Sequence, residues 1–192
     1  MNRRWTWLAA ALLLAGCGGE PAAPPLAGAR IGGPFTLVDE TGKTVTERDF
    51  AGKYRIVYFG YTFCPDVCPV DMRNLMLGLK AFEAEAPARA AKVQPIFVTT
   101  DPERDTPAVL TDFTNAFHPR LIGLGGTAEQ VKAAMKAYAV YAQKGEKRPD
   151  GGYLVDHSRV ALLMGPKGDP IAMLPQDGTP QDIAADLDRF VQ

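Results

Sequence analysis

The sequence contains few histidines and cysteines, little net charge and no long apolar run. Two histidines and three cysteines occur among its 192 residues, and the formal net charge at pH 7 is −1. A chain without a net positive charge has little electrostatic attraction to nucleic acid or to an anionic membrane. The apolar stretch Trp5–Ala15 is shorter than the about 20 residues that a membrane-spanning helix needs. These features argue against nucleic acid as a partner and against a transmembrane helix.

The N-terminus has the pattern of an export signal. Arg3 and Arg4 precede the apolar stretch, in the order of the positive and hydrophobic regions of a signal peptide. The stretch ends in Leu14–Cys17, whose sequence Leu-Ala-Gly-Cys resembles a bacterial lipobox. We therefore predict a lipoprotein signal peptide over residues 1–16 and lipidation of Cys17. The alternative is an ordinary secretory signal in which this cysteine is incidental.

Composition divides the remaining chain into a tether and one domain. Residues 17–32 are dominated by proline, alanine and glycine, a composition typical of flexible linkers. Residues 33–192 suffice for one domain with a full hydrophobic core. If Cys17 carries lipid, Cys64 and Cys68 are the remaining thiols. Export places this pair in an oxidising environment.

Strand and helix patterns alternate along the predicted domain. The sequence context of Thr106, Thr127 and Thr179 is that of helix N-caps. This order is that of an α/β, thioredoxin-like fold, with a central mixed sheet flanked by helices and an N-terminal β-hairpin. The predicted elements are the hairpin Phe35–Thr46, the strands Arg55–Tyr61, Val93–Thr100, Leu121–Leu124, Tyr153–Val155, Arg159–Met164 and Ile171–Leu174, and the helices Val70–Glu83, Thr106–Phe117, Thr127–Val140 and Thr179–Val191.

Cys64 and Cys68 stand where the strand Arg55–Tyr61 leads into a helix. Residues four apart on a helix share a face, so the two thiols can close a disulfide or hold one soft metal ion. The positive end of the helix dipole is expected to lower their pKa values. Pro65 and Pro69 suit the first helical turn, where a missing N–H is harmless.

A metal at this pair requires a third ligand. His118 lies in a polar loop and is predicted to be solvated. His157 precedes a predicted core strand, in the loop that faces the cysteine helix in thioredoxin-like folds. Two thiolates and a neutral imidazole form a soft, three-coordinate site that suits Cu(I). Alternatively, His157 is held by Asp156 for structural reasons.

Three motifs carry a resemblance to the Sco/SenC family of copper-binding, thioredoxin-like assembly factors for cytochrome c oxidase. The resemblance runs from about residue 33 to residue 192. Phe59–Pro69 is similar to the family's cysteine motif, and Asp101–Pro107 to its second signature. Val155–Ser158 is similar to the segment that bears the family's histidine ligand. We expect the second signature to shape a loop and to cap a helix, without chemistry of its own.

The resemblance implies that Cys64, Cys68 and His157 bind one copper ion, as Cu(I) and also as Cu(II). It implies delivery to the dinuclear copper centre of cytochrome c oxidase subunit II, or reduction of the cysteines of that centre. The first activity makes the chain a metallochaperone, and the second a thiol:disulfide oxidoreductase. Further expected partners are a periplasmic copper donor or a thiol reductant.

Nearby side chains receive supporting roles. Asp156 is predicted to orient His157, because ligating imidazoles usually donate their other N–H. Asp66 and Asp71 are predicted to place negative charge near the thiolates, with ordinary capping or solvation as the alternative for all three acids. The helical spacing of Met72 and Met76 predicts core positions rather than copper ligands.

Two other functional classes fit less well. A general thiol:disulfide reductase usually has two residues between its cysteines and would not need His157. A peroxiredoxin-like peroxidase would require proline and threonine where this chain has Val57 and Tyr61.

We expect a lipid-anchored protein that faces the periplasm, on the inner rather than the outer membrane. The outer membrane is the alternative, because the residue after Cys17 is glycine and not the aspartate associated with inner-membrane retention.

Overall fold

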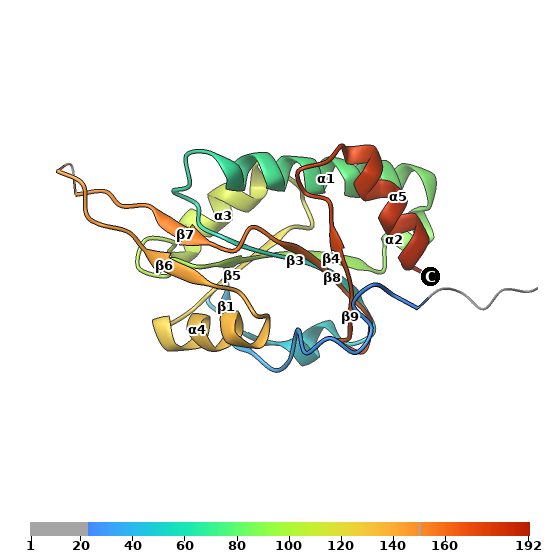
Figure 1. The fold of residues 1–192 in the computed structure, drawn as a ribbon, viewed down its shortest axis with the longest axis horizontal. Helices are drawn as coiled ribbons and strands as arrows, with labels where there is room; N and C mark the ends of the chain where they lie inside the picture. The colour runs from blue at the N-terminus through green and yellow to red at the C-terminus, as the bar shows by residue number, and fades with distance from the viewer. Residues whose placement is uncertain (1–22, 150) are drawn as a thin grey trace, which may run out of the picture.

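A computed structural model describes residues 23–149 and 151–192 (Figure 1). The predicted signal peptide, residues 1–16, and Cys17 lie outside these residues. In the described part of the chain, no helix combines the length and the apolar composition needed to cross a membrane.

A seven-stranded mixed sheet forms the centre of the fold, in the order β2-β1-β5-β4-β3-β8-β9. β3 runs parallel to β4 and antiparallel to β8, and every one of its residues is buried. The strands are β1 (Thr36–Asp39), β2 (Thr44–Thr46), β3 (Tyr54–Gly60), β4 (Val93–Thr99), β5 (Ile122–Gly125), β8 (Ala161–Met164) and β9 (Pro170–Leu174). This arrangement confirms the predicted α/β class, mixed sheet and N-terminal hairpin.

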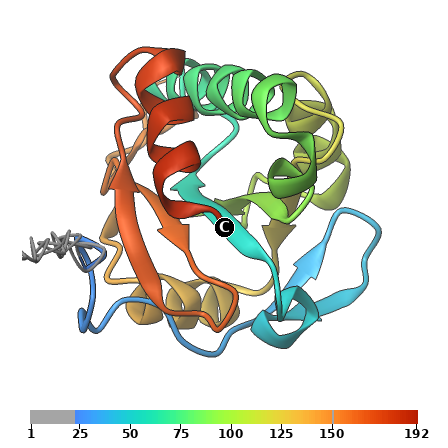
Figure 2. The same cartoon turned by 90° about the vertical axis from the view of Figure 1, so that its right-hand side faces the viewer.

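Helices cover both faces of the sheet (Figures 1 and 2). The helices are α1 (Val67–Glu85), α2 (Pro87–Ala90), α3 (Pro107–Asn115), α4 (Ala128–Ala137), α5 (Pro180–Phe190) and the 3-10 helix η1 (Glu47–Phe50). Successive side chains of a strand point to opposite faces, so Ile56 and Tyr58 join the core beneath α1 and α5, whereas Val57 and Phe59 join the core on the α4 side. Both cores lie within residues 26–192, so this part of the chain is expected to fold by itself.

The three predicted helix caps are confirmed. The side chains of Thr106, Thr127 and Thr179 accept hydrogen bonds from backbone N–H groups in the first turns of α3, α4 and α5. Met72 and Met76 are buried in α1, as predicted for core positions. Pro95 lies in the part of β4 that pairs with β3 alone.

The predicted tether is too long. The backbone N–H of Leu26 donates to the carbonyl of Ile171 at 3.0 Å, and that of Gly32 donates to Ala137 at 2.9 Å. Leu26 and Ile31 also pack against the α4-side core. These apolar side chains attach the segment to the domain, although the surrounding composition resembles a linker.

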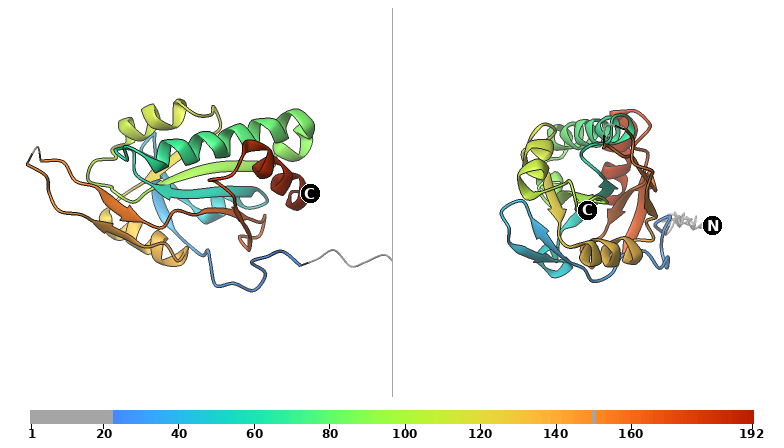
Figure 3. Two further views of the ribbon diagram at one scale, coloured as in Figure 1. Left: turned by 45° about the horizontal axis from the view of Figure 1, so that its top comes forward. Right: turned by 90° about the vertical axis from the view of Figure 1, so that its left-hand side faces the viewer.

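A two-stranded sheet outside the main one was not fully predicted. β7 (Val155–His157) pairs with β6 (Ala142–Lys144), and the two strands form the base of an arm that projects from the domain (Figure 3). The predicted strand at Tyr153–Val155 is therefore shifted toward His157. This shift decides which side of β7 each side chain occupies.

Candidate metal centre

The two cysteines lie at the junction between β3 and α1. α1 begins at Val67, three residues earlier than predicted, so Cys68 lies in its first turn and Cys64 lies in the preceding loop. Both thiols are free and buried. The backbone N–H of Cys68 donates to Sγ of Cys64 at 3.5 Å. Asp66, the N-cap residue, makes no side-chain capping bond, so the Cys64 sulfur occupies the place of a capping acceptor.

His157 reaches the same junction from β7. Its Nε2 lies 3.3 Å from Sγ of Cys68, which is 89 positions earlier in the chain. Its Nδ1 lies 3.1 Å from the carbonyl oxygen of Ser158. A carbonyl only accepts, so Nδ1 carries the proton and Nε2 presents its lone pair to the thiol. Burial lowers the pKa of His157 below its ordinary value, which also favours the neutral imidazole that a metal requires.

The predicted orienting role of Asp156 is wrong. Neighbouring residues of a strand point to opposite sides, so Asp156 is exposed while His157 faces Cys68. The Ser158 carbonyl provides the hydrogen bond instead. Backbone carbonyls commonly hold metal-ligating imidazoles in this way.

The two other acidic residues differ from one another. Asp66 is exposed. Asp71 is fully buried, accepts a hydrogen bond from the Tyr58 hydroxyl at 2.8 Å and forms an ion pair with Arg159. The predicted negative charge of Asp71 is therefore balanced by a guanidinium rather than directed at the thiols.

Aromatic rings enclose the imidazole and the Cys68 thiol. The ring centroids of Tyr58 and Tyr61 lie 6.4 and 5.9 Å from that of His157, both edge-on. A Cβ atom on Gly60 would lie 3.0 Å from Sγ of Cys68. Glycine at the end of β3 therefore leaves the space in which this thiol lies.

Burial raises the pKa of the Cys68 thiol well above its ordinary value. This is the opposite of the shift predicted from the helix dipole. The side chain has no exposed surface, and the cost of removing a thiolate from water exceeds the stabilisation by the helix N-terminus. Cys68 is therefore protonated at neutral pH in the free protein.

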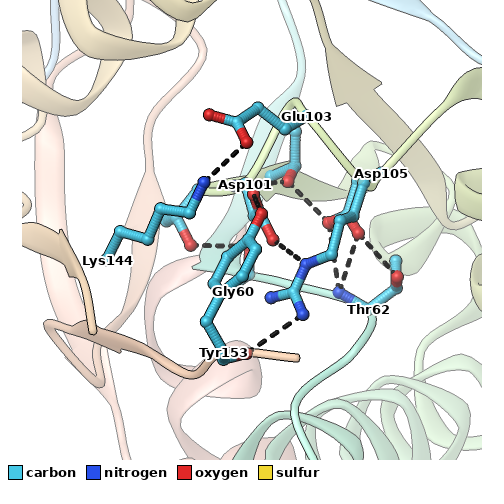
Figure 4. A network of polar contacts seen from close by, with 10 residues as sticks. Gly60, Thr62, Asp101, Glu103, Asp105, Lys144 and Tyr153 are labelled. Carbon is cyan, nitrogen blue, oxygen red and sulfur yellow. Dashed lines mark hydrogen bonds and ion pairs between the residues drawn. The ribbon is translucent and has the colours of Figure 1, made fainter. Parts of the chain in front are cut away.

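The segment Asp101–Pro107 does more than shape a loop and cap α3. The carboxylate of Asp105 accepts from the backbone N–H of Thr62 at 3.1 Å and from its hydroxyl at 2.6 Å (Figure 4). It also accepts from the Thr99 hydroxyl at 2.6 Å. Asp105 thus attaches the cysteine loop, residues 61–66 between β3 and α1, to the end of β4.

The segment Asp101–Pro107 also holds the arm that has β6 and β7 at its base and carries His157. Asp101 accepts from the Tyr153 hydroxyl at 2.8 Å and pairs with Arg104 (Figure 4). The Arg104 guanidinium donates to the Tyr153 carbonyl and lies over the rings of Tyr61 and Phe63 in the cysteine loop. The motif was visible in the sequence, but its role depends on contacts with residues about fifty positions away.

His118 is buried, so the predicted solvated position is wrong. Its Nδ1 accepts from the backbone N–H of Arg120 at 3.1 Å, and its Nε2 lies 3.3 Å from Glu83. Glu83 also pairs with Arg120. These contacts account for its polar atoms at the far end of α1 and leave Cys64, Cys68 and His157 as the candidate ligands.

The candidate ligands are close but not yet arranged as a closed site. Among the described residues, no three His, Cys, Asp or Glu side chains form a ready-made metal-binding group. Cys68 and His157 are in contact, and the Cys64 sulfur is held by the Cys68 N–H. Two sulfurs and one imidazole nitrogen are donors of the kind that suits a soft metal ion such as Cu(I).

Comparisons with known proteins place this chain in a family. The model described as SCO1/SenC matches residues 23–192. The chain belongs to the SCO1/SenC family. It is 46% identical over 166 residues to the protein SenC of Rhodobacter capsulatus, covering 86% of this chain and 72% of that protein. It spans about half the length of several mitochondrial SCO1 and SCO2 relatives.

Solved structures agree with this assignment. The structure of Bradyrhizobium japonicum ScoI with copper bound is 40% identical, with a TM-score of 0.75, and the match covers 84% of this chain and 99% of that chain. BsSco, described as a member of the Sco family of cytochrome c oxidase assembly proteins with a disulfide switch, is 25% identical with a TM-score of 0.64 over 84% of this chain and 94% of its own. The thioredoxin-like fold prediction is thus confirmed for this SCO1/SenC chain.

Proposed function

We propose that this SCO1/SenC chain binds one copper ion through Cys64, Cys68 and His157 and supplies it for assembly of the copper centre of cytochrome c oxidase subunit II. The 3.3 Å separation between Cys68 Sγ and His157 Nε2 carries the proposal. A disulfide reductant needs two thiols, whereas a soft metal needs the third ligand that the imidazole provides. Copper is the cargo of this activity rather than a resident cofactor.

The protein groups have separate roles in holding the cargo. The Ser158 carbonyl keeps the His157 proton on Nδ1, so that Nε2 is free to bind. The thiol protons leave when Cu(I) binds, because the thiolate is the ligand. The rings of Tyr58 and Tyr61 pack edge-on against the imidazole and help to fix its orientation.

The site also lies close to the surface, as transfer requires. Cys64 retains 9% exposure, and the adjacent Phe63 is 50% exposed. An incoming ligand can therefore approach the metal from the side of Cys64 and the half-buried His157, while Cys68 stays covered. Copper-bound ScoI and the oxidase-assembly description of BsSco support both the metal and its destination.

The proposed cellular position follows from the N-terminal sequence. Residues 1–16 are proposed as the signal peptide and Cys17 as the lipid attachment site, with the domain facing the periplasm beside the inner membrane. Labelling with a radioactive fatty acid tests this assignment. Cys17→Ser should abolish labelling and release the domain from the membrane, whereas an unchanged labelled product would show that the lipid is attached elsewhere.

Anaerobic titration of reduced residues 23–192 tests the copper site. Competition with a chromophoric Cu(I) chelator should show one tightly bound ion per chain, and His157→Ala should weaken binding by at least about tenfold. His118→Ala is the matched control, because it removes the other histidine outside the site. Equal Cu(I) affinity in wild type and His157→Ala would exclude the three-ligand site.

Thiol reduction is the second candidate function, supported by the contact between the two free cysteines and by the disulfide switch of BsSco. In this reaction Cys64 and Cys68 become a disulfide, and the two electrons convert a disulfide of subunit II into two thiols. A subunit II fragment with oxidised cysteines separates the candidates. If the chain is a reductase, His157→Ala should still convert the disulfide of this fragment into two thiols. If the chain transfers copper, His157→Ala should lose the transfer.

A further inference from the structure

Arg55 is a buried cation in the central sheet. It lies second in β3, between Gln94 of β4 and Met164 of β8, and is only 3% exposed. No described carboxylate forms an ion pair with it. Its Nη2 donates to the Gly165 carbonyl across a long 3.5 Å distance, and its Nε has no hydrogen-bond partner among the described residues.

Such an arrangement is costly unless something else compensates the charge. A guanidinium stays protonated in proteins, so Arg55 cannot become neutral as a buried lysine or carboxyl can. Burying a charge without a partner is strongly unfavourable. An anion from outside the domain would offset this cost, and guanidinium groups hold oxyanions through two parallel hydrogen bonds.

A cavity of about 340 Å³ lies against Arg55. Its walls come from the segment before β1, from η1 and from the turn between β8 and β9, which lie together at one end of the molecule (Figure 2). Three cations line it, namely Arg48, Arg55 and Lys167, against the single carboxylate of Glu47. The cavity is large enough for a small anion and has an excess of positive charge.

Glu47 does not compensate Arg55. One of its carboxylate oxygens accepts from the backbone N–H of Phe35 at 3.1 Å, and the other lies 3.6 Å from Nε of Arg48. Arg48 itself is 90% exposed. The buried guanidinium is therefore a part of the cavity wall that has unused hydrogen-bonding capacity.

Glycine keeps the approach to Arg55 open. A Cβ atom on Gly168 would lie 3.2 Å from Nη2 of Arg55, and the backbone of Gly168 has a φ of +88°. Glycine adopts this conformation without strain. The turn between β8 and β9 thus comes close to the guanidinium without a side chain that would cover it.

We propose that this cavity binds a small oxyanion, such as phosphate or a carboxylate, through the guanidinium of Arg55. The exposed Arg48 and Lys167 would attract the anion to the entrance. The cysteines follow the other end of β3, about 17 Å away at the rise of a β-strand. The anion site is therefore separate from the proposed copper site and does not depend on it.

Thermal unfolding of residues 23–192 tests this proposal. At equal ionic strength, millimolar phosphate should raise the Tm of wild type above its value in chloride by at least about 3 °C, in a saturable manner. A parallel series with acetate distinguishes a carboxylate site from a phosphate site. Arg55→Met should lose the response to either oxyanion and should be more stable than wild type in chloride, because it removes the unpaired charge.

Arg73→Met is the matched control, since it removes an exposed arginine of α1 and should keep the wild-type response. A second measurement needs no variant: in wild type, phosphate or acetate should shift the NMR signals of the Arg55 Nε–H and of the Gly165 and Gly168 amides. An equal Tm response in Arg55→Met, or the absence of any oxyanion-specific Tm and NMR change in wild type, would overturn the proposal.

Discussion

Arg159 holds Asp71 through two hydrogen bonds, from Nε at 2.7 Å and from Nη2 at 2.5 Å. Asp71 lies in α1, three residues after Cys68, and Arg159 lies two residues after His157. The ion pair therefore connects the two parts of the chain that bring the candidate ligands together. Because Asp71 is fully buried and Arg159 is 37% exposed, most of the cost of breaking the pair falls on the acidic partner.

Replacing Asp71 by asparagine should destabilise the domain and loosen the proposed copper site. Asparagine keeps the shape but loses the charge that accepts both hydrogen bonds from Arg159, and hydrogen bonds to charged groups contribute about 1.5–3 kcal/mol. We expect a loss of about 2 kcal/mol in urea unfolding and weaker Cu(I) binding. Asp66→Asn makes the same charge change at an exposed position and should alter stability by less than about 0.5 kcal/mol. Equal effects of the two substitutions would contradict a special role for the ion pair.

Gly60→Ala should displace the Cys68 thiol. The added Cβ would lie 2.9 Å from a ring carbon of Tyr58 and 3.0 Å from Sγ of Cys68, so neighbouring groups must move, at a cost of about 1–3 kcal/mol. Cu(I) affinity, measured by chelator competition, should fall by at least about tenfold.

Gly123→Ala is the control for overpacking. Its Cβ would lie 2.8 Å from Glu40 and 3.0 Å from Leu110. The substitution therefore causes overpacking at β5, at a place that does not include the cysteines. This variant should lose stability but keep the wild-type Cu(I) affinity. If both variants bind copper equally well, the glycine at the end of β3 is not needed to place the thiol.

The sequence was sufficient to predict the features that depend on neighbouring residues. The strand before Cys64, the following helix and the threonine caps all depend on local patterns, and the structure has them. The side of β7 on which Asp156 and His157 lie depends on pairing with β6. That partner strand is only three residues long, Ala-Gln-Lys, and has no recognisable strand pattern. The orienting group was therefore assigned to Asp156 instead of the Ser158 carbonyl.

Two further errors arose from contacts between distant residues. The helix dipole acts locally and predicts a lowered thiol pKa, but burial of Cys68 beside side chains from other elements has the larger effect. His118 has a polar sequence context, yet its hydrogen-bond partner Glu83 lies 35 positions earlier. Neither the burial nor the partner can be obtained from periodicity, because both require the packing of α1 against the sheet.

The buried His118 should make stability depend on pH. Burial lowers its pKa below the ordinary value of 6.5, so the unfolded chain takes up a proton at a higher pH than the folded chain. The stability contribution of neutral His118 is present above pH 6.5 and is lost as pH falls through its folded pKa. Each pH unit by which folding lowers the pKa of a histidine contributes about 1.4 kcal/mol to the free energy of unfolding.

Urea unfolding between pH 7.5 and pH 5 measures this dependence. His157 has a pKa lowered by burial as well, and the chain has two histidines in all, so both contribute over the same range. His118→Asn should reduce the slope of the unfolding free energy against pH. The double variant His118→Asn, His157→Asn should remove most of this slope. A slope unchanged in the double variant would assign the dependence to carboxyl groups instead.

Cu(I) affinity should rise with pH because copper must displace the proton of Cys68. The pKa of this thiol lies well above neutrality owing to burial, so the proton is present in the free protein throughout pH 6–8. Each proton released on binding makes the apparent affinity increase about tenfold per pH unit. In competition titrations at pH 6, 7 and 8, the logarithm of the Cu(I) affinity should therefore rise with pH with a slope of at least one. Cys68→Ser should lower both this slope and the affinity. A pH-independent affinity in wild type would mean that Cys68 is already a thiolate, and that the helix N-terminus outweighs burial at this site.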